Sequence, residues 1–200
     1  MIKRALDGLL ASSGIVASLP LWAVIATAVK LEDGGPVYYT QVRVGLEGRS
    51  FMALKFRSMT PDAEAHVGAV QAVGDDARVT RVGRWLRATA MDELPQLWNI
   101  LRGDMSFVGP RALRPGEIEV SHTECVPLEA VPGYATRITV RPGLTGVAQI
   151  YAARDVPRRL KFRYDSLYIK RQSLWLDLRL ILLSFWISFH GTWEARGPKY

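Results

Sequence analysis

Cysteine is nearly absent from this chain, and histidine is scarce. Its 200 residues include one cysteine, Cys125, and three histidines, His66, His122 and His190. A single thiol excludes an internal disulfide and any zinc site built on cysteines. The histidines lack the spacing of metal ligands, so we assign them no role. The chain also has no internal repeat or low-complexity tract, and its length allows one domain plus a small accessory element.

Acidic residues are the minority charge. The 26 Lys and Arg residues exceed the 19 Asp and Glu residues, giving a formal charge of +7 and a pI of about 9.8. Of the basic residues 20 are arginines, whose planar fork suits phosphate oxygens. A phosphate-bearing partner is therefore indicated. Charge alone leaves nucleic acid, anionic lipid and nucleotide-sugar open.

One long hydrophobic run stands near the start of the chain. From Ala5 to Val29 the residues are apolar or small except for Asp7, and the run is long enough to reach across a bilayer. Pro20 lies inside it, where proline removes a backbone hydrogen bond and kinks a helix. We therefore predict a kinked helix. Three serines carry hydroxyls that can take up backbone groups freed by the break: Ser12, Ser13 and Ser18.

Two placements in a bilayer fit this run. A single straight crossing is the commonest meaning of such a stretch. With Lys3 and Arg4 in the cytoplasm, however, it would export everything from Leu31 onward, which carries 23 basic and 18 acidic residues. An excess of positive charge belongs on the cytoplasmic side. A re-entrant hairpin that turns at Pro20 keeps both flanks cytoplasmic, and this is the form we predict for residues 1–33.

The most informative segment is Met91–Asn99, with the sequence MDELPQLWN. Pro95 fits only the first turn of a helix, so a helix is predicted to begin near Asp92. Asp92 and Glu93 would then lie at its positive end, where ionised carboxylates are favoured. Four arginines in the flanking segments could hold a phosphate beside them: Arg84, Arg87, Arg102 and Arg111. The plainer alternative is a helix cap and a dipole complement, each worth about 1 kcal/mol.

The remaining segments predict an α+β fold. Glycine turns bound β-branched and aromatic runs at Val37–Val44 and Phe51–Phe56, which predict a small β-hairpin that delivers Lys55–Met59 to one end. We expect a mobile loop at residues 61–78. Several short helices follow, with Arg81–Arg87 the first. Long loops come after them. We expect these loops to be ordered and to carry the functional site, as rigidly held loops often do.

Two further helices are predicted near the end of the chain. Pro157 opens a basic and aromatic helix that runs to about Arg171. The last helix, Leu174–Phe189, is apolar except for one narrow polar stripe: Ser173, Asp177, Ser184 and Ser188. We expect both to be amphipathic helices at the membrane interface. A second membrane crossing is the alternative for the last helix.

Short motifs follow one another along the chain: Gly35-Pro36-Val37, Gln41-Val42-Arg43-Val44-Gly45, Lys55-Phe56-Arg57-Ser58-Met59, Gly74-Asp75-Asp76, Arg81-Val82-Gly83-Arg84, Asp92-Glu93, Gly103-Asp104-Met105-Ser106, Val108-Gly109-Pro110-Arg111, Arg141-Pro142-Gly143-Leu144-Thr145-Gly146, and Asp165 with Tyr168. Each is weak by itself, but their joint order and spacing are specific. From about Leu6 to Ile187 the chain therefore resembles the bacterial sugar transferases, the catalytic core of the monotopic phosphoglycosyl transferases.

The resemblance implies a reaction at the cytoplasmic face of the bacterial inner membrane. A sugar-1-phosphate would move from a UDP-sugar to polyprenyl (undecaprenyl) phosphate with release of UMP, as the first membrane step of glycoconjugate or exopolysaccharide assembly. It also implies Mg²⁺ as cofactor. Asp92 would be the nucleophile that forms a covalent phosphosugar-aspartate. Glu93 would be its partner in binding the metal or in activating the second substrate.

Five other residues complete the predicted site. We assign four to phosphate or lipid-phosphate contacts and the last to orienting an arginine or the metal: Lys55, Arg57, Arg111, Arg141 and Asp165. A carboxylate that attacks a dianionic diphosphate must overcome charge repulsion, which Mg²⁺ and arginines reduce. The structural alternative for each arginine is a salt bridge. Residues 34–200 would form the catalytic domain at the membrane face, with residues 1–33 as its monotopic anchor.

Two other classes of function also fit parts of the sequence. A non-catalytic basic adaptor that binds anionic lipid or nucleic acid explains the charge and the apolar helices, but it leaves the paired acids unexplained. A metal-dependent phosphodiesterase would share the carboxylates and use water as its nucleophile. Under the leading hypothesis the partners are a UDP-sugar, polyprenyl phosphate and membrane lipid, with no nucleic acid. The sugar, the pathway, the polyprenol length and the oligomeric state, including a homo-oligomer, stay open.

Overall fold

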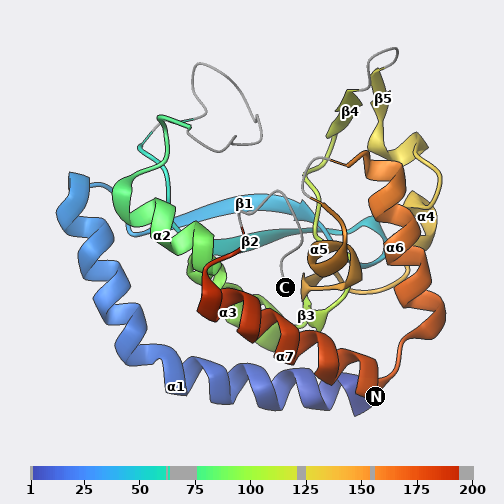
Figure 1. Ribbon diagram of the computed structural model, residues 1–200, viewed down its shortest axis with the longest axis horizontal. Coiled ribbons are helices and arrows are strands. Elements are labelled where there is room, and N and C mark those ends of the chain that lie inside the picture. Colours follow the sequence, from blue (N-terminus) through green and yellow to red (C-terminus); the bar gives the residue numbers. More distant parts are fainter. Residues whose placement is uncertain (1, 62, 64–75, 121–124, 154–155, 194–200) are drawn as a thin grey trace.

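The computed structural model describes residues 2–61, 63, 76–120, 125–153 and 156–193, and it combines helices with small sheets (Figure 1). The α-helices are α1 (Ile2–Asp33), α2 (Arg81–Thr89), α3 (Gln96–Arg102), α4 (Tyr134–Arg137), α5 (Val147–Tyr151), α6 (Arg158–Arg171) and α7 (Leu174–His190). The strands are β1 (Tyr38–Val44), β2 (Ser50–Phe56), β3 (Ser106–Val108), β4 (Ile118–Val120), β5 (Cys125–Pro127) and β6 (Gly143–Thr145). The predicted mixture of helix and sheet is confirmed. The loop predicted at residues 61–78 lies mostly outside the described residues.

Three two-stranded sheets organise the backbone. β1 and β2 form the antiparallel hairpin that the sequence predicts, and its register runs from Tyr38 opposite Phe56 to Val44 opposite Ser50. β3 and β6 pair in parallel, although they are far apart in the chain. β4 and β5 form a second antiparallel hairpin at the upper edge of the molecule in Figure 1. The first hairpin crosses the centre and delivers its end to the region of the paired acids.

Helix α1 is long, apolar and bent. Figure 1 shows two arms that meet at a sharp bend, and the helix contains Pro20. Its buried positions are Asp7, Ala11, Ile25 and Val29, which share one side of the helix. Large apolar side chains on its other sides are exposed: Ile2, Leu9, Val16, Leu19, Val24 and Leu31. In the part of the chain that the structure describes, α1 is the one helix long and apolar enough to cross a membrane.

The predicted hairpin of two helices is not confirmed. Helical backbone continues from Ile2 to Asp33, so the kink takes the form of a bend within one helix. A proline at position 20 frees the carbonyl of Val16. The hydroxyl of Ser18 does bond to the backbone, but its acceptor is the carbonyl of Gly14 at 2.6 Å.

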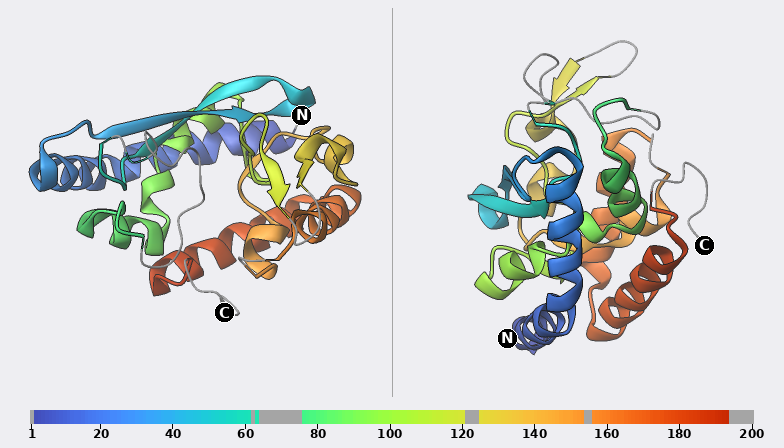
Figure 2. Two further views of the ribbon diagram at one scale, coloured as in Figure 1. Left: turned by 90° about the horizontal axis from the view of Figure 1, so that it is seen from above. Right: turned by 90° about the vertical axis from the view of Figure 1, so that its left-hand side faces the viewer.

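Helix α7 turns its polar stripe toward the protein. Asp177 is 3% exposed, and the Ser184 hydroxyl donates to Thr145 Oγ1 at 2.5 Å. The opposite side carries exposed large apolar side chains: Trp175, Leu178, Leu182, Phe185, Trp186 and Phe189. The first arm of α1 and helix α7 lie in the lower part of the molecule in Figure 1 and in the right-hand view of Figure 2. Both helices expose large apolar side chains on their outer sides.

The main core fills the space between α1, α3, α7 and β3. Its buried side chains come from these four elements, from Met105 just before β3, and from α5 and α6: Ala11, Leu97, Ile100, Met105, Phe107, Val108, Ile150, Tyr168, Leu180 and Ile187. A second cluster joins the far arm of α1 to α2 and β2 through Ile25, Val29, Phe56 and Leu86. The two clusters hold both arms of the bent helix against one body.

Candidate active site

The two neighbouring acids lie in a single turn of 3-10 helix, Met91–Glu93, between α2 and α3. Asp92 and Glu93 are both buried, with 8% of each residue exposed. Ala90 caps the end of α2, and its left-handed backbone (φ 56°) turns the chain into this segment. Pro95 stands directly before α3. The helix predicted to begin near Asp92 thus begins at Gln96, one turn later.

Glu93 is held by two cations. Lys55 Nζ donates to its Oε1 at 2.5 Å, and Arg111 Nη2 donates to the same oxygen at 2.8 Å. Burial alone would raise the pKa of Glu93, but the charges and hydrogen bonds of Arg111 and Lys55 outweigh it and hold the pKa far below its usual range. The charge of Glu93 in turn raises the pKa of Arg111. Glu93 is therefore ionised at every physiological pH.

Asp92 has a different environment. Lys55 Nζ lies 4.0 Å from Asp92 Oδ2, which is beyond hydrogen-bond distance. Burial raises the pKa of Asp92 to about 6; Lys55 lowers it, and the adjacent charge of Glu93 raises it further. The pKa values of the two adjacent carboxyl groups are thus shifted in opposite directions. This arrangement is typical of sites that do acid, base or nucleophilic chemistry.

Asn99 places Lys55 opposite the acids. This residue of α3 is 1% exposed, and its side-chain amide bonds to the backbone of β2. Nδ2 donates to the carbonyl of Met52 at 2.7 Å, and Oδ1 accepts from the N–H of Leu54 at 3.0 Å. One side chain therefore holds α3, which follows the acids, against β2, which carries Lys55 near its end.

A close crossing of two backbones places Arg111. The N–H of Gly109 donates to Thr145, and the N–H of Gly143 donates to Pro110, each at 2.9 Å. A Cβ on Gly109 would lie 2.4 Å from the carbonyl oxygen of Arg141, and one on Gly143 would lie 2.0 Å from the nitrogen of Gly109. Only glycine allows this approach. The motifs that contain these glycines thus form one structural unit, and Arg111 follows directly from it.

Asp165 supports the same loop from α6. It accepts from Arg137 Nε at 3.2 Å, and Arg137 Nη2 donates to the backbone carbonyl of Arg111 at 2.6 Å. The guanidinium also lies over the ring of Phe162, 4.6 Å from its centre. Asp165 therefore orients an arginine, one of the two roles expected for it, and acts on Arg111 through Arg137.

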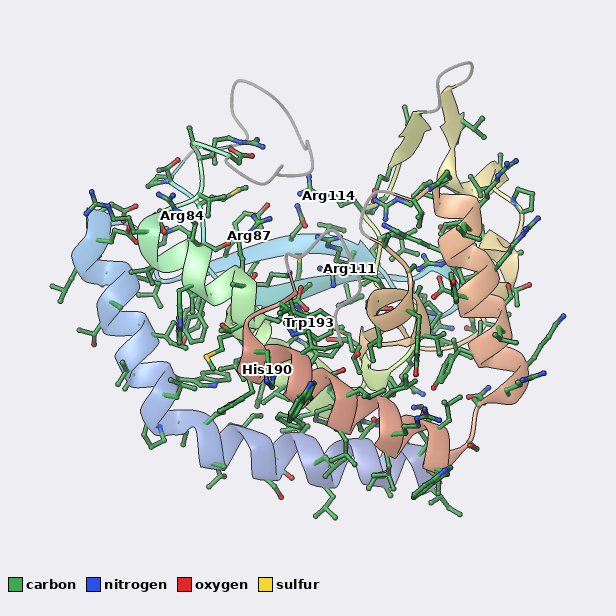
Figure 3. All side chains as sticks on the ribbon, viewed as in Figure 1. Arg84, Arg87, Arg111, Arg114, His190 and Trp193 are labelled. Atoms are coloured by element: carbon green, nitrogen blue, oxygen red, sulfur yellow. The ribbon has the colours of Figure 1, made fainter. Side chains whose placement is uncertain are left out.

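More cations surround the acids than the predicted site contains. Arg87, in the last turn of α2, lowers the pKa of Asp92 through its charge. Burial, and then the like charges of Arg111 and Arg114, lower the pKa of Arg43 to about 10. Figure 3 shows Arg87, Arg111 and Arg114 over the central part of the molecule. This concentration of positive charge suits a ligand that carries several negative charges.

The other arginines expected near the acids lie elsewhere. Arg57 is 6% exposed, and both terminal nitrogens of its guanidinium bond to Asp33 at the end of α1. Arg141 Nε donates to Gly103 at 2.8 Å, at the far end of α3 from the acids. Arg102 is on the exposed surface near that same end, and Arg84 is exposed on α2. The assignment of Arg57 and Arg141 to phosphate contacts stays a prediction.

The carboxylates fit a metal only in part. Mg²⁺ usually takes one or two protein carboxylates and completes its shell with water and substrate phosphates. Both ion pairs of Glu93 use Oε1, which leaves Oε2 outside them. Among the described residues no group of three or more His, Cys, Asp and Glu side chains gathers. Asp92 and Glu93 therefore fit a Mg²⁺ that arrives with phosphate, and not a metal enclosed by protein ligands alone.

Three residues of this site escape the sequence-based assignment: Arg43, Asn99 and Arg137. Arg87 was among the arginines expected to hold phosphate beside the acids, and its charge does act on Asp92. Asn99 lies inside the acid-bearing segment, but nothing in sequence shows that its amide reaches β2. Arg43 and Arg137 could not be assigned to the site from sequence, because each is placed there by packing against distant parts of the chain.

Comparison with known proteins gives a consistent result. Residues 1–191 match the bacterial sugar transferase family. A UDP-glucose:undecaprenyl-phosphate glucose-1-phosphate transferase of Klebsiella pneumoniae is 43% identical over 195 residues, which cover 94% of this chain and 40% of that protein. A UDP-N-acetylgalactosamine-undecaprenyl-phosphate N-acetylgalactosaminephosphotransferase of Aeromonas hydrophila is 43% identical over 183 residues, covering 90% of this chain and 42% of that protein.

A shorter relative aligns over most of its own length. The exopolysaccharide production protein ExoY of Rhizobium meliloti (strain 1021) is 38% identical over 195 residues, which cover 90% of this chain and 82% of that protein. In contrast, the chain spans about two fifths of the Klebsiella and Aeromonas proteins. The match over residues 1–191 includes α1, the acid pair, the glycine crossing and α7. The chain belongs to the bacterial sugar transferase family.

Proposed function

We propose that this protein moves a sugar-1-phosphate from a UDP-sugar to polyprenyl phosphate, with Asp92 as the nucleophile and UMP as the leaving group. The observation that carries the proposal is the division of labour between two adjacent buried acids. Glu93 is locked by Lys55 and Arg111, whereas no hydrogen bond reaches the Asp92 carboxylate from any described residue. A buried acid with a purely structural role would be paired. The names of the relatives support the choice of substrates.

The geometry suits a two-step transfer. In the first step a carboxylate oxygen of Asp92 bonds to the phosphorus that bears the sugar, and the bond from that phosphorus to the bridging oxygen breaks and releases UMP. In the second step an oxygen of polyprenyl phosphate bonds to the same phosphorus and the Asp92–phosphorus bond breaks, which gives polyprenyl-diphospho-sugar and free Asp92. Arg111 and Lys55, which both bond to Glu93, would stabilise the negative charge that spreads over the phosphoryl oxygens.

The chain's own residues prepare Asp92 for this attack. With its pKa near 6, most Asp92 side chains are ionised at neutral pH. The carboxylate also lacks strong hydrogen bonds, which would otherwise have to break before it could bond to phosphorus. Mg²⁺ bound by Asp92, Glu93 and the donor diphosphate would reduce the repulsion between carboxylate and phosphate. Glu93, fixed by its two ion pairs, would hold such an ion without moving.

Helix α1 supports a monotopic placement at one membrane face. Both of its ends are bonded to the same body: Arg4 donates to Ile100 and Leu101 of α3, and Glu32 accepts from the N–H of Arg81 at 2.6 Å at the start of α2. Two ends tied to one body cannot lie on opposite sides of a bilayer unless that body spans it. The exposed apolar sides of α1 and α7 would contact lipid. We place this body at the cytoplasmic face of the bacterial inner membrane because of its positive charge.

The activity is tested with the full chain in lipid nanodiscs, using a panel of UDP-sugars, polyprenyl phosphate and Mg²⁺. UMP release by the wild type is expected with at least one donor, and the donor that works identifies the sugar. Asp92→Asn should abolish UMP release while the protein stays in the nanodisc. Glu47→Gln, at an exposed acid that pairs with the exposed Arg49, is the matched control and should keep full activity. An active Asp92→Asn enzyme refutes the assigned nucleophile.

Intact-mass measurement separates transfer from hydrolysis. With donor alone, the wild type should gain the mass of one sugar phosphate, and this gain should disappear on addition of polyprenyl phosphate. Release of UMP without any adduct would instead favour a metal-dependent phosphodiesterase that uses water. Retention of nucleic acid with no turnover of any UDP-sugar would favour the adaptor.

Cysteine labelling tests the membrane placement. Ile2 is 72% exposed and the Arg49 side chain is 83% exposed, so both sites accept a cysteine, in a Cys125→Ser background. Ile2→Cys and Arg49→Cys should react from the same side of sealed vesicles. Labelling from opposite sides would show a straight crossing and would refute the monotopic arrangement.

A further inference from the structure

Three charged residues in the first two turns of α1 point into the protein. In sequence, Lys3 and Arg4 have the usual look of cationic flanks of a membrane segment. In the structure, Arg4 donates to the carbonyls of Ile100 at 2.5 Å and Leu101 at 2.6 Å, in the last turn of α3, where carbonyls lack the usual helical partners. Its guanidinium also complements the negative end of that helix. These bonds tie α1 to the element that follows the paired acids.

Asp7 forms the second tie. It is 5% exposed, and its Oδ1 accepts from the backbone N–H of Phe107 at 3.0 Å and from the Ser106 hydroxyl at 3.1 Å. Strand β3 pairs on its other side with β6, where the N–H of Ser106 donates to Pro142. The carboxylate of Asp7 thus takes the place of a neighbouring strand along the open edge of β3.

Lys3 reaches the same strand through two intermediates. Its ammonium group donates to Asp177 of α7 at 2.6 Å. The Tyr168 hydroxyl of α6 lies 2.8 Å from Asp177 Oδ1 and 3.1 Å from the carbonyl oxygen of Val108, so its single proton can be donated to either acceptor. Side chains therefore reach both kinds of backbone group in β3. Asp7 accepts from the N–H of Phe107, and the Tyr168 hydroxyl lies within hydrogen-bond distance of the carbonyl of Val108.

Strand β3 leads directly to the acid pair. Three residues after Val108 the chain reaches Arg111, whose guanidinium is 2.8 Å from Glu93. The glycine crossing holds the intervening backbone, so a shift of β3 would be transmitted to Arg111 with little loss. A buried carboxylate in an apolar helix is costly unless it is paired. An anchor alone has no need of Asp7, whereas a device that aligns β3 does.

We infer that Asp7 is a positioning residue for sugar-phosphate transfer: its bonds to β3 hold Arg111 against Glu93, which makes the first turns of the membrane helix part of the catalytic body. The inference rests on the proposed function, because the effect is measured on that reaction. It also assigns Tyr168 a matching role at the backbone carbonyl of Val108 in the same strand. Neither side chain touches the substrate in this mechanism.

The test compares variants of the full chain in nanodiscs. Asp7→Ala removes the acceptor and is expected to lower kcat for UMP release about tenfold or more. Asp7→Asn keeps an amide oxygen that can accept from Phe107, so it should retain most of the activity. Ser13→Asn places the same side chain on the exposed side of the same helix and should behave as wild type. Nanodisc retention and thermal unfolding are measured for every variant.

A double-mutant cycle distinguishes positioning from general damage. If Asp7 acts through Arg111, the loss caused by Asp7→Ala should be much smaller in an Arg111→Lys background than in the wild type. Should Asp7→Ala fail to fold, Tyr168→Phe removes one hydroxyl at nearly constant volume and enters the same cycle. Independent losses that multiply, or a wild-type kcat in Asp7→Ala, would overturn the inference.

Hydrogen exchange supplies a readout that needs no turnover. Asp7→Ala should speed exchange at the Phe107 amide and in the segment 105–111, and Ser13→Asn should not. If the wild type releases no UMP from any donor, the proposed function fails while this measurement still tests the tie to β3. If the wild type is active and exchange at Phe107 is unchanged in Asp7→Ala, the inference fails and the proposed function stands.

Discussion

Replacing Lys55 with glutamine tests whether the two acids are tuned as a pair. Under the proposed mechanism Asp92 must be ionised to attack, and its pKa of about 6 would place the loss of activity in mildly acidic solution. Below pH 6 the reactive fraction should fall about tenfold per pH unit. Lys55→Gln removes the positive charge 4.0 Å from Asp92 and weakens the pairing of Glu93. Both changes raise the pKa of Asp92.

The size of the shift follows from the distance. Two unit charges 4.0 Å apart interact by about 4 kcal/mol at an effective dielectric constant of about 20, which corresponds to about 3 pKa units as an upper limit. The Lys55 and Asp92 side chains are 18% and 12% exposed, so solvent screens part of this interaction. We expect the midpoint to rise by about 1 to 2 units, to between about 7 and 8.

The assay is the pH dependence of kcat/KM for UMP release, because this quantity reports ionisation in the free enzyme. It is recorded between about pH 5 and 9 at fixed Mg²⁺ in nanodiscs. Arg84→Gln removes an exposed positive charge from α2 and is the matched control, with an unchanged midpoint. A lower plateau in Lys55→Gln would report lost phosphate binding and is separate from the midpoint. A midpoint that stays in place, or moves down, refutes the electrostatic coupling.

Three further changes probe other parts of the structure. Asn99→Ala leaves the backbone groups of Met52 and Leu54 unpaired in a buried place and should lower the free energy of unfolding by roughly 3 kcal/mol, seen as reduced thermal stability. Asp165→Asn leaves the buried charge of Arg137 without its counter-ion, so a loss of about 3 to 5 kcal/mol is expected by denaturant unfolding; an unchanged midpoint would contradict it. Phe189→Ser, at a side chain 88% exposed, should weaken partition into liposomes by about 2 kcal/mol without changing turnover in detergent.

Much of the fold follows from local signals. The β1–β2 hairpin, α2, α6 and α7 begin and end within a few residues of their predicted bounds, because glycine turns, Pro157 and the alternation of apolar residues act over short distances. The bend in α1 is likewise expected from Pro20. Which side of a helix packs against the protein, however, depends on distant parts of the chain. The polar stripe of α7 has the same sequence pattern whether it faces water or, as here, the protein.

The site divides in the same way. The acids and Arg111 belong to motifs that are recognisable one at a time, and the structure brings Lys55 to them from a strand 38 residues earlier. The fate of the other arginines depends on their partners. Arg57 and Arg111 look alike in sequence, yet Asp33 occupies the first and Glu93 the second. Which acid an arginine contacts is decided by the packing of the whole chain. The sequence therefore shows which charged residues are present, and not which of them pair.

The bend in α1 and the position of the acids are two aspects of one arrangement. Before the bend, Ala11 packs in the same cluster as Leu97 and Ile100 of α3; after it, Trp22 and Ile25 pack with Met91. Leu94 contacts both clusters.

Asp92 and Glu93 stand between Met91 and Leu94, so one layer of side chains separates the acid pair from the inner side of the bent helix. A straight α1 could not meet both clusters at once. The outer side of the same helix carries exposed apolar side chains. The bend is therefore what lets both arms of α1 pack beside the segment that carries the acids.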